Sequence, residues 1–398
     1  MFTTTKSLPL ATTITGSLPR PLWFVENLRG RAFLTAISSD LSYREQYGDA
    51  VAALIADQSR AGLDIVSDGE MRFDMDIGGR SWFGYLFDRM DGLGQVDVRK
   101  GGAEWTARSG SQRRTDTPGD ILHEVMQTRL PPLVVGPVGP GSLQYDAVWR
   151  VAQRLSARPV KMGSCSAQMI DKMVVNKFYK DRRESVMALS EALNQEHHRL
   201  ADAGCGIIQI EEPCVHYAAD IDWEISTAGY VEAFNREVRG LRTKTEVWCH
   251  TCWGNPLAQR IESSYSYRAA LPYLEQLDAD VITVETADND GAEIAEIAAA
   301  ISQDKKLCIG VVNHRTLQVE RPDEVAALIR KALKHIRPER LVLSSDCGFG
   351  RQGMSRIPRA LQDGRHRAGR QHRAPRARPS GSHRQRRRSA LFAGVKHS

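Results

Sequence analysis

The sequence has no long hydrophobic run, and this absence excludes the simplest membrane proteins. No apolar stretch in its 398 residues approaches the roughly 18 that a membrane-spanning helix requires. The first residues, MFTTTKSLPLATTITGS, also lack the apolar core of a secretory signal. With 41% hydrophobic and 26% charged residues, the composition is that of an ordinary globular protein. We therefore expect a soluble, cytoplasmic protein without a membrane partner.

Acidic residues are missing after Asp363. Residues 364–398 hold ten Arg and one Lys, and without them the formal net charge changes from +6 to −5. Residues 1–363 are therefore mildly acidic and carry no electrostatic footprint for nucleic acid. We predict one folded domain over 1–363 and a basic, low-complexity tail over 364–398, either disordered or the product of a shifted reading frame.

Two explanations account for the Arg-rich tail. A natural arm for nucleic acid or membrane phosphates predicts affinity that falls steeply with salt, but no aromatic platform for bases accompanies its charges. We favour a shifted reading frame. The stretch QDGRHR at 362–367 can be encoded caa gat ggt cgc cat cgt, which one base later reads as the apolar helical sequence KMVAIV. Sequencing the gene distinguishes the two.

Eight short apolar runs alternate with helical patterns. Polar residues do not alternate with the apolar ones in these runs, and such continuous apolar runs are typical of parallel strands buried on both faces. Helical patterns between them end near Gly62 and Gly204, and one begins at Pro322, where the missing N–H costs nothing. This alternation predicts an α/β fold, a single (β/α)8 TIM barrel, with a doubly wound sheet as the alternative. The predicted strands are 12–15, 64–67, 159–162, 206–210, 245–249, 280–284, 307–312 and 341–344.

Residues 71–158 separate the second and third predicted strands by more than one helix requires. Their segment 101–120, GGAEWTARSGSQRRTDTPGD, is polar and rich in turn residues. We therefore predict a long insertion between strands 2 and 3, with this segment on the surface at one end of the barrel.

Four side chains that follow predicted strands make a candidate zinc site. His250 and Cys252 are two residues apart, so on extended chain both point the same way. Thiolate, imidazole and carboxylate are ligands that zinc accepts, and Glu285 and Cys347 follow two other strands. Ligands from three strands favour a catalytic site over a structural one. The alternative is a buried cysteine beside a hydrogen-bonded histidine.

Other titratable residues allow simpler interpretations. Cys205, Cys249 and Cys308 lie in or beside apolar strands, so we expect them in the core. We expect His197 and His335, which fall on helical patterns, at the surface.

Glu70 and Glu211 follow the second and fourth predicted strands. Either could be a surface acid or an acid at a helix start. Together at neighbouring strand ends they would instead form an anionic socket for an ammonium group.

Five stretches together resemble the catalytic half of cobalamin-independent methionine synthase: TGSLPRP, IIQIEEP, HTC, DADVITVETADND and PERLVLSSDCGFG. The resemblance runs in the same order from Thr12 to about Arg356 and implies a TIM barrel with zinc (Zn2+) in its mouth. The resemblance implies that the zinc ligands are His250, Cys252, Glu285 and Cys347. It implies that the homocysteine-binding groups are Gly16, Ser17, Glu70 and Glu211. It gives His314 a role in proton handling at the methyl donor.

The sequence departs from this family in three places. Family members active on folate polyglutamates usually carry an additional N-terminal barrel, which is absent here. Glu211 stands where an Asp is expected. No Trp lies between Lys161 and Arg183 to stack on a pterin, a contact that Phe178 or Tyr179 could supply.

We therefore predict a zinc-dependent S-methyltransferase that moves a methyl group from a methyl-folate-type donor to homocysteine, giving methionine. Zinc would keep the substrate sulfur as the thiolate, which is the nucleophile. The alternative is an epoxyalkane:coenzyme M transferase with the same zinc chemistry, whose sulfonate calls for Arg72 or Arg315. Glu70 and Glu211 favour an aminothiol. The partners are then a small-molecule thiol and a methyl donor, and the oligomeric state is left open.

Overall fold

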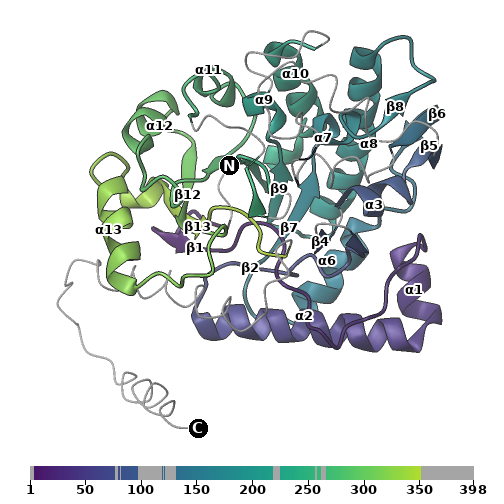
Figure 1. Ribbon diagram of the computed structural model, residues 1–398, viewed down its shortest axis with the longest axis horizontal. Coiled ribbons are helices and arrows are strands. Elements are labelled where there is room, and N and C mark those ends of the chain that lie inside the picture. Colours follow the sequence, from purple (N-terminus) through teal and green to yellow (C-terminus); the bar gives the residue numbers. More distant parts are fainter. Residues whose placement is uncertain are drawn as a thin grey trace.

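Eight parallel strands form the central sheet of the computed structural model (Figure 1). The structure describes residues 4–76, 79–80, 82–96, 119, 121, 131–217, 225–255, 258–260 and 266–350. Each strand overlaps one of the eight predicted runs. They are β1 (Ala11–Thr12), β2 (Val66–Ser67), β7 (Val160–Cys165), β9 (Ile207–Glu211), β10 (Glu246–Thr251), β11 (Val281–Val284), β12 (Lys306–Val312) and β13 (Leu341–Ser345).

The sheet curls until its two end strands meet. The strand order is β1-β13-β12-β11-β10-β9-β7-β2, so β1 and β2 stand at opposite ends of it. The carbonyl of Thr12 accepts hydrogen bonds from the backbone N–H groups of Asp64 and Ile65, each at 3.0 Å. The Asp64 carboxylate in turn accepts from the Thr12 backbone N–H at 3.0 Å and hydroxyl at 2.8 Å. These bonds tie the two edges together, and the predicted TIM-barrel fold is confirmed.

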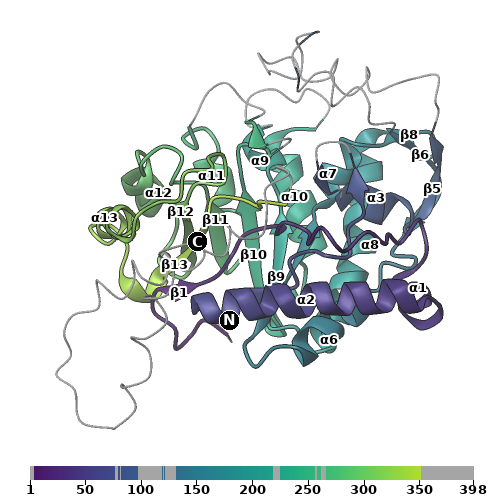
Figure 2. The same cartoon turned by 60° about the horizontal axis from the view of Figure 1, so that its bottom comes forward.

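Helices surround the strands on the outside, and α2 runs along one side of the barrel (Figures 1 and 2). The longer helices are α1 (Phe33–Ser39), α2 (Leu41–Ala61), α3 (Trp82–Phe87), α6 (Tyr145–Arg154), α8 (Arg182–Asp202), α10 (Thr227–Glu237), α12 (Ile294–Ala300) and α13 (Pro322–Ala332). The short ones are α7 (Ala167–Asp171), α9 (Cys214–Tyr217) and α11 (Leu271–Leu274), with 3-10 turns at Leu241–Thr243 and Pro338–Arg340. Helices between successive strands are the expected companions of a parallel sheet.

The sequence signals at the helix ends act as predicted. The Asp40 side chain caps α2 by accepting from the Tyr43 backbone N–H, and Gly62 ends it with φ 86°, a left-handed conformation that glycine adopts without strain. Pro322 occupies the first turn of α13, where its missing N–H is not needed. Local sequence thus sets the length of these helices, while their apolar faces fix them against the sheet.

The insertion between β2 and β7 adds a small sheet beside the barrel. In it β5 (Asp91–Val96) pairs antiparallel with β6 (Pro132–Gly139), and β6 pairs parallel with β8 (Val175–Asn176). A short hairpin of β3 (Met75–Asp76) and β4 (Gly79–Arg80) precedes it. The long insertion predicted between strands 2 and 3 therefore has structure of its own. Its polar segment lies almost wholly outside the described residues, as do residues 351–398, so the domain boundary at 363 stays a prediction.

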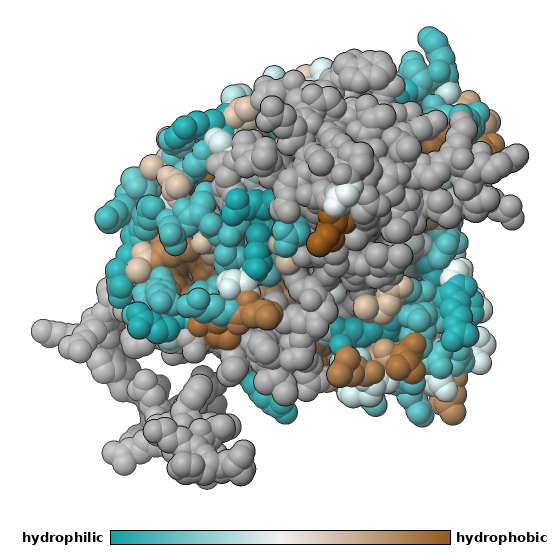
Figure 3. Space-filling view, in the orientation of Figure 1, coloured by the Kyte–Doolittle hydropathy of each residue, from teal (hydrophilic) through white to brown (hydrophobic). Residues whose placement is uncertain are grey.

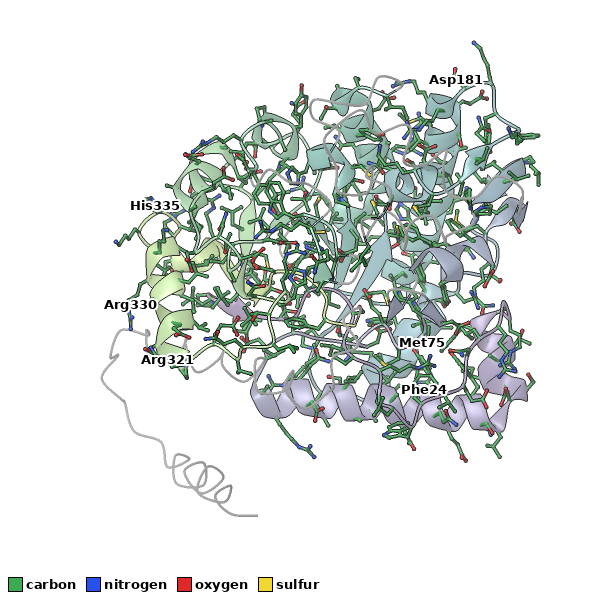
Figure 4. All side chains as sticks on the ribbon, viewed as in Figure 1. Phe24, Met75, Asp181, Arg321, Arg330 and His335 are labelled. Carbon is green, nitrogen blue, oxygen red and sulfur yellow. The ribbon has the colours of Figure 1, made fainter. Side chains whose placement is uncertain are left out.

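The surface seen in Figure 3 is mainly hydrophilic, with small separate apolar patches. Three of the exposed large apolar side chains follow β1: Leu22 is 94% exposed, Val25 66% and Trp23 48%. His335 is exposed near the end of α13, as predicted (Figure 4). Within the described ranges, no helix combines the length and the apolar character that crossing a membrane requires.

Candidate metal centre

The end of β10 carries the first two residues of the predicted zinc site. His250 lies in the strand and Cys252 follows it, so the two side chains share one face of the extended chain. Both side chains are buried, His250 completely and Cys252 with 6% of its surface exposed. The strand therefore presents an imidazole and a thiol side by side inside the barrel mouth.

Cys347 joins the predicted ligands into one cluster. Ligand atoms of His250, Cys252 and Cys347 all lie within 4.8 Å of one another, and so do those of Glu285, His314 and Cys347. All of these side chains are buried. The structure thus places the four predicted zinc ligands in two groups that share Cys347: one holds His250 and Cys252, and the other holds Glu285 with His314.

The donor set fits a zinc ion. Two thiols, one imidazole and one carboxylate are ligands that zinc takes, and Cys347 links the group of His250 and Cys252 to that of Glu285. Without a metal, a hydrogen bond with Cys252, burial and the neighbouring Cys252 charge raise the pKa of the Cys347 thiol well above its usual value. A bound dication would reverse this effect by favouring the thiolates.

The carboxylate of Glu211 forms a hydrogen bond with His250. The Nδ1 atom of His250 donates to Glu211, and its Nε2 atom lies 3.2 Å from the backbone carbonyl of Asp346. Burial disfavours the imidazolium, but the Glu211 charge and hydrogen bond outweigh it and raise the pKa of His250 to about 9. A carboxylate on the far nitrogen of a ligand histidine fixes the ring orientation, as in many zinc sites.

An arginine holds Glu285. Both carboxylate oxygens accept from one guanidinium nitrogen of Arg315 at 2.9 Å, and one also accepts from the Trp253 backbone N–H at 3.1 Å. Burial raises the pKa of Glu285, and the Arg315 charge counteracts it. Arg315 also lies 3.2 Å from Asp288. Glu285 is therefore fixed in place by a cation before any metal binds.

Asp346, which precedes Cys347, connects two loops of the site. Its fully buried carboxylate accepts from the backbone N–H groups of Thr286, Ala287 and Asp288 at 2.8–2.9 Å. Those residues follow Glu285, so Asp346 fixes the distance between two predicted ligands. Sequence reasoning missed this role, although an acid directly before Cys347 was a visible signal.

The loop of Gly16 and Ser17 packs directly on the loop of Cys347. The Ser17 carbonyl accepts from the backbone N–H groups of Phe349 at 2.7 Å and Gly350 at 3.0 Å. A Cβ on Gly16, whose φ is 67°, would lie 2.8 Å from the Cα of Gly348. Glycine is required for this contact, and it brings two of the predicted homocysteine-binding residues beside the cluster.

Glu70 and Glu211 are both buried, so the surface interpretation of these acids is wrong. Nor do they follow neighbouring strands, because β7 lies between β2 and β9. Gly163 of β7 leaves room for the first acid: a Cβ there would lie 2.7 Å from Oε1 of Glu70. The two carboxylates thus face one region of the mouth across a strand that lacks a side chain at this point.

The two arginines near the site are already paired with protein acids. Arg72 is fully buried, 3.2 Å from Asp68, and donates to the carbonyl of Gly163 at 2.7 Å. Arg315 is paired with Glu285, as described above. Neither guanidinium is presented to a substrate as a free anion-binding group.

His197 is wrongly predicted to lie at the surface. It is fully buried and its Nε2 atom lies 2.9 Å from the Ser164 hydroxyl. The helical pattern hid this because α8 packs against α10, α7, α6 and β6, which buries more of its circumference than one apolar stripe. Cys205, Cys249 and Cys308 are buried, as predicted.

Comparison with known proteins identifies the family. A profile described as "Cobalamin-independent synthase, Catalytic domain" matches residues 112–370, more than half of the chain. Methionine synthases of Saccharolobus islandicus and Sulfolobus acidocaldarius are 29% and 26% identical to it over 343 and 345 residues, each covering 85% of this chain and 88% or 86% of the relative.

Solved structures agree in fold. A B12-independent methionine synthase of Shewanella sp. W3-18-1, in complex with selenomethionine, superposes with a TM-score of 0.70 at 24% identity. A putative vitamin-B12 independent methionine synthase of Listeria monocytogenes gives 0.63 at 16% identity. Each comparison covers 91% of this chain and 97% of the other. The chain therefore belongs to the cobalamin-independent methionine synthase family and carries that family's catalytic domain.

Proposed function

We propose that the protein is a zinc-dependent S-methyltransferase that transfers a methyl group from a methyl-folate-type donor to homocysteine and so forms methionine. The observation that carries this proposal is the pair of buried ligand groups that share Cys347, one with His250 and Cys252 and the other with Glu285. Family membership supports the reaction class, and the curated relatives of similar length are methionine synthases.

The four clustered side chains would hold the metal. When bound there, zinc would supply a positive charge that keeps the substrate thiol deprotonated at neutral pH. Glu211 orients His250, Arg315 orients Glu285, and Asp346 ties the loop of Glu285 to that of Cys347. These contacts preorganise the ligands, so little conformational freedom remains to be lost when the centre forms.

The thiol substrate would lie between the cluster and the two buried acids. Glu70 and Glu211 provide negative charge for the α-ammonium group of homocysteine, and the Gly16–Ser17 loop closes the other side against Cys347. Glu211 would then serve three partners, since one of its oxygens holds His250 and the other accepts from Gln209. Burial excludes water from these charged contacts and strengthens them.

The methyl donor requires an acid, because a methyl group leaves an amine nitrogen poorly unless that nitrogen is protonated. His314 is buried within reach of Glu285 and Cys347, which supports a role in delivering this proton. For the pterin ring, Phe178 is half exposed, whereas the Tyr179 hydroxyl is fastened to the backbone N–H of Val138. Phe178 is therefore the better candidate of the two for a stacking contact.

Thiol discrimination tests the proposal against the coenzyme M alternative. The pairing of Arg72 with Asp68 and of Arg315 with Glu285 disfavours a sulfonate thiol. We expect zinc-loaded protein to bind homocysteine and to form methionine with methyltetrahydrofolate, and to bind coenzyme M at least about 10-fold more weakly, as one lost charged contact implies. Tighter binding of coenzyme M, or no methionine formed with zinc bound, would contradict the proposal.

A further inference from the structure

Lys161 is a buried charge inside the barrel, below the mouth. It lies on β7 with 3% of its surface exposed, and its Nζ atom is 5.0 Å from the ring centroid of Trp248. The inner layer next to it is apolar on the other seven strands: Ala11, Ile65, Ile207, Trp248, Val281, Cys308 and Val342. Burying an ammonium group in such surroundings costs free energy unless hydrogen bonds compensate for the lost water.

The contacts of Lys161 have a fixed direction. Its Nζ atom donates to the carbonyl of Ile14 and to Oε1 of Gln209, each at 2.7 Å. Because an ammonium group can only donate, the Gln209 oxygen must face Lys161 and the amide nitrogen must face the other way. That nitrogen donates to Oε1 of Glu211 at 2.5 Å.

The series of hydrogen bonds continues from Gln209 to the metal centre. Residues 207, 209 and 211 alternate onto the inner face of β9, so Gln209 stands directly below Glu211. One oxygen of Glu211 accepts from Gln209, and the other accepts from Nδ1 of His250. Gln209, Glu211 and His250 are each at most 2% exposed, so water does not compete for these bonds.

We propose that Lys161 is a positioning residue for the metal centre: through Gln209 and Glu211 it fixes the proton of His250 on Nδ1 and leaves Nε2 for the metal. This inference rests on the proposed role of His250 as a ligand. Without Lys161 the Gln209 amide loses one of the two side-chain contacts that orient it, so the amide and the Glu211 carboxylate that holds His250 are less firmly placed. Lys161 thus acts on the metal across three hydrogen bonds.

A pair of lysine variants tests this positioning role. Lys161→Met keeps an unbranched side chain, one atom shorter, and removes both charge and donor. Lys306→Met is the matched control, because Lys306 is also a buried barrel lysine and its Nζ atom donates to the Thr5 carbonyl at 2.7 Å. The readouts are the zinc dissociation constant, from competition with a chromophoric chelator, and the visible spectrum of the cobalt-loaded protein.

We expect Lys161→Met to bind zinc about 10-fold more weakly, the lower end of what outer-shell changes produce, and to shift the cobalt absorption bands. Lys306→Met keeps the wild-type affinity and spectrum. A purely structural role for Lys161 would lower the melting temperature but leave the spectrum of the loaded fraction unchanged.

The outcomes separate this inference from the proposed function. If wild type binds zinc and Lys161→Met has the same affinity and spectrum, the positioning role is overturned and the proposed function stands. If wild type binds no metal, both are overturned. If Lys161→Met does not fold, Gln209→Met replaces it, since that variant keeps the bond from Lys161 to Ile14 and interrupts the path to Glu211. Wild-type behaviour of Gln209→Met would equally overturn the inference.

Discussion

Arg315 donates to both carboxylate oxygens of Glu285 from one guanidinium nitrogen, at 2.9 Å each. Both side chains are buried, with at most 9% of either exposed. When no metal is bound, Arg315 therefore provides the positive charge that balances Glu285. This arrangement makes the stability of the protein depend on the metal in a way that a variant can reveal.

Arg315→Gln removes that charge and leaves Glu285 buried. We expect the metal-free variant to lose about 3–5 kcal/mol of unfolding free energy, as when one partner of a buried ion pair is removed. Zinc would supply the missing positive charge, so we expect zinc to raise the melting temperature of the variant more than that of wild type. Thermal unfolding with and without zinc measures both effects.

Arg260→Gln is the control for this experiment. Arg260 bonds to Asp288, which is also a partner of Arg315, and its side chain is one-third exposed. We expect its loss to cost under about 1 kcal/mol with no added response to zinc. Equal responses of the two variants to zinc would contradict the role assigned to Arg315.

Gly163→Ala tests the amine socket without touching either acid. The new Cβ would lie 2.7 Å from Oε1 of Glu70, so the carboxylate must move. Loss of one charged hydrogen bond to the substrate amounts to about 1.5–3 kcal/mol, so we expect KM for homocysteine to rise at least about 10-fold. Steady-state kinetics with homocysteine measure the change.

Two controls make the result specific to the amine. Gly136→Ala introduces the same methyl group on β6, where its nearest neighbour would lie 3.8 Å away, so KM is expected to stay at the wild-type value. For 4-mercaptobutyrate, which lacks the amino group, Gly163→Ala and wild type are expected to have the same KM. An equal rise of KM for both thiols would show that Glu70 does not bind the amino group of homocysteine.

His197 predicts how stability depends on pH. Burial lowers the pKa of His197 to about 3 and raises that of the neighbouring Glu237 well above its usual value. Between about pH 6.5 and pH 3 the folded protein therefore binds no proton at His197, whereas the unfolded chain does. Between pH 7 and pH 5 this residue is expected to remove about 2 kcal/mol of unfolding free energy.

Denaturant unfolding of wild type and His197→Gln at the two pH values isolates this effect. Glutamine keeps a polar partner for the Ser164 hydroxyl but does not titrate. We expect the stability of the variant to fall by about 2 kcal/mol less than that of wild type between pH 7 and pH 5. Parallel curves for the two proteins would contradict the assigned pKa.

The sequence was sufficient for the barrel, because each buried parallel strand leaves its own apolar run. It also indicated the cluster, since strands of a barrel bring their carboxyl ends to one rim. His250, Cys252, Glu285 and Cys347 could therefore be grouped before any coordinates were available.

The contacts that hold those ligands were not predictable in the same way. Arg315 was interpreted as a possible sulfonate-binding group, whereas it pairs with Glu285, and Lys161 was only one residue in an apolar run. Both roles depend on the register between strands and on which side chains meet inside the barrel. His197 was placed at the surface because a helical pattern shows one buried stripe, whereas several elements pack against α8.

Metal content tests the central claim most directly. We expect purified full-length protein to contain one zinc per chain, bound through two sulfur ligands in X-ray absorption. Cys252→Ser is expected to lower zinc affinity by more than about 100-fold, beyond the range of outer-shell changes, and to abolish methionine formation while the fold remains. Cys205→Ser, which changes a buried thiol bonded to the Ile207 carbonyl, is expected to keep the zinc. A folded protein without stoichiometric zinc, or one that keeps its zinc and activity in Cys252→Ser, would contradict the account.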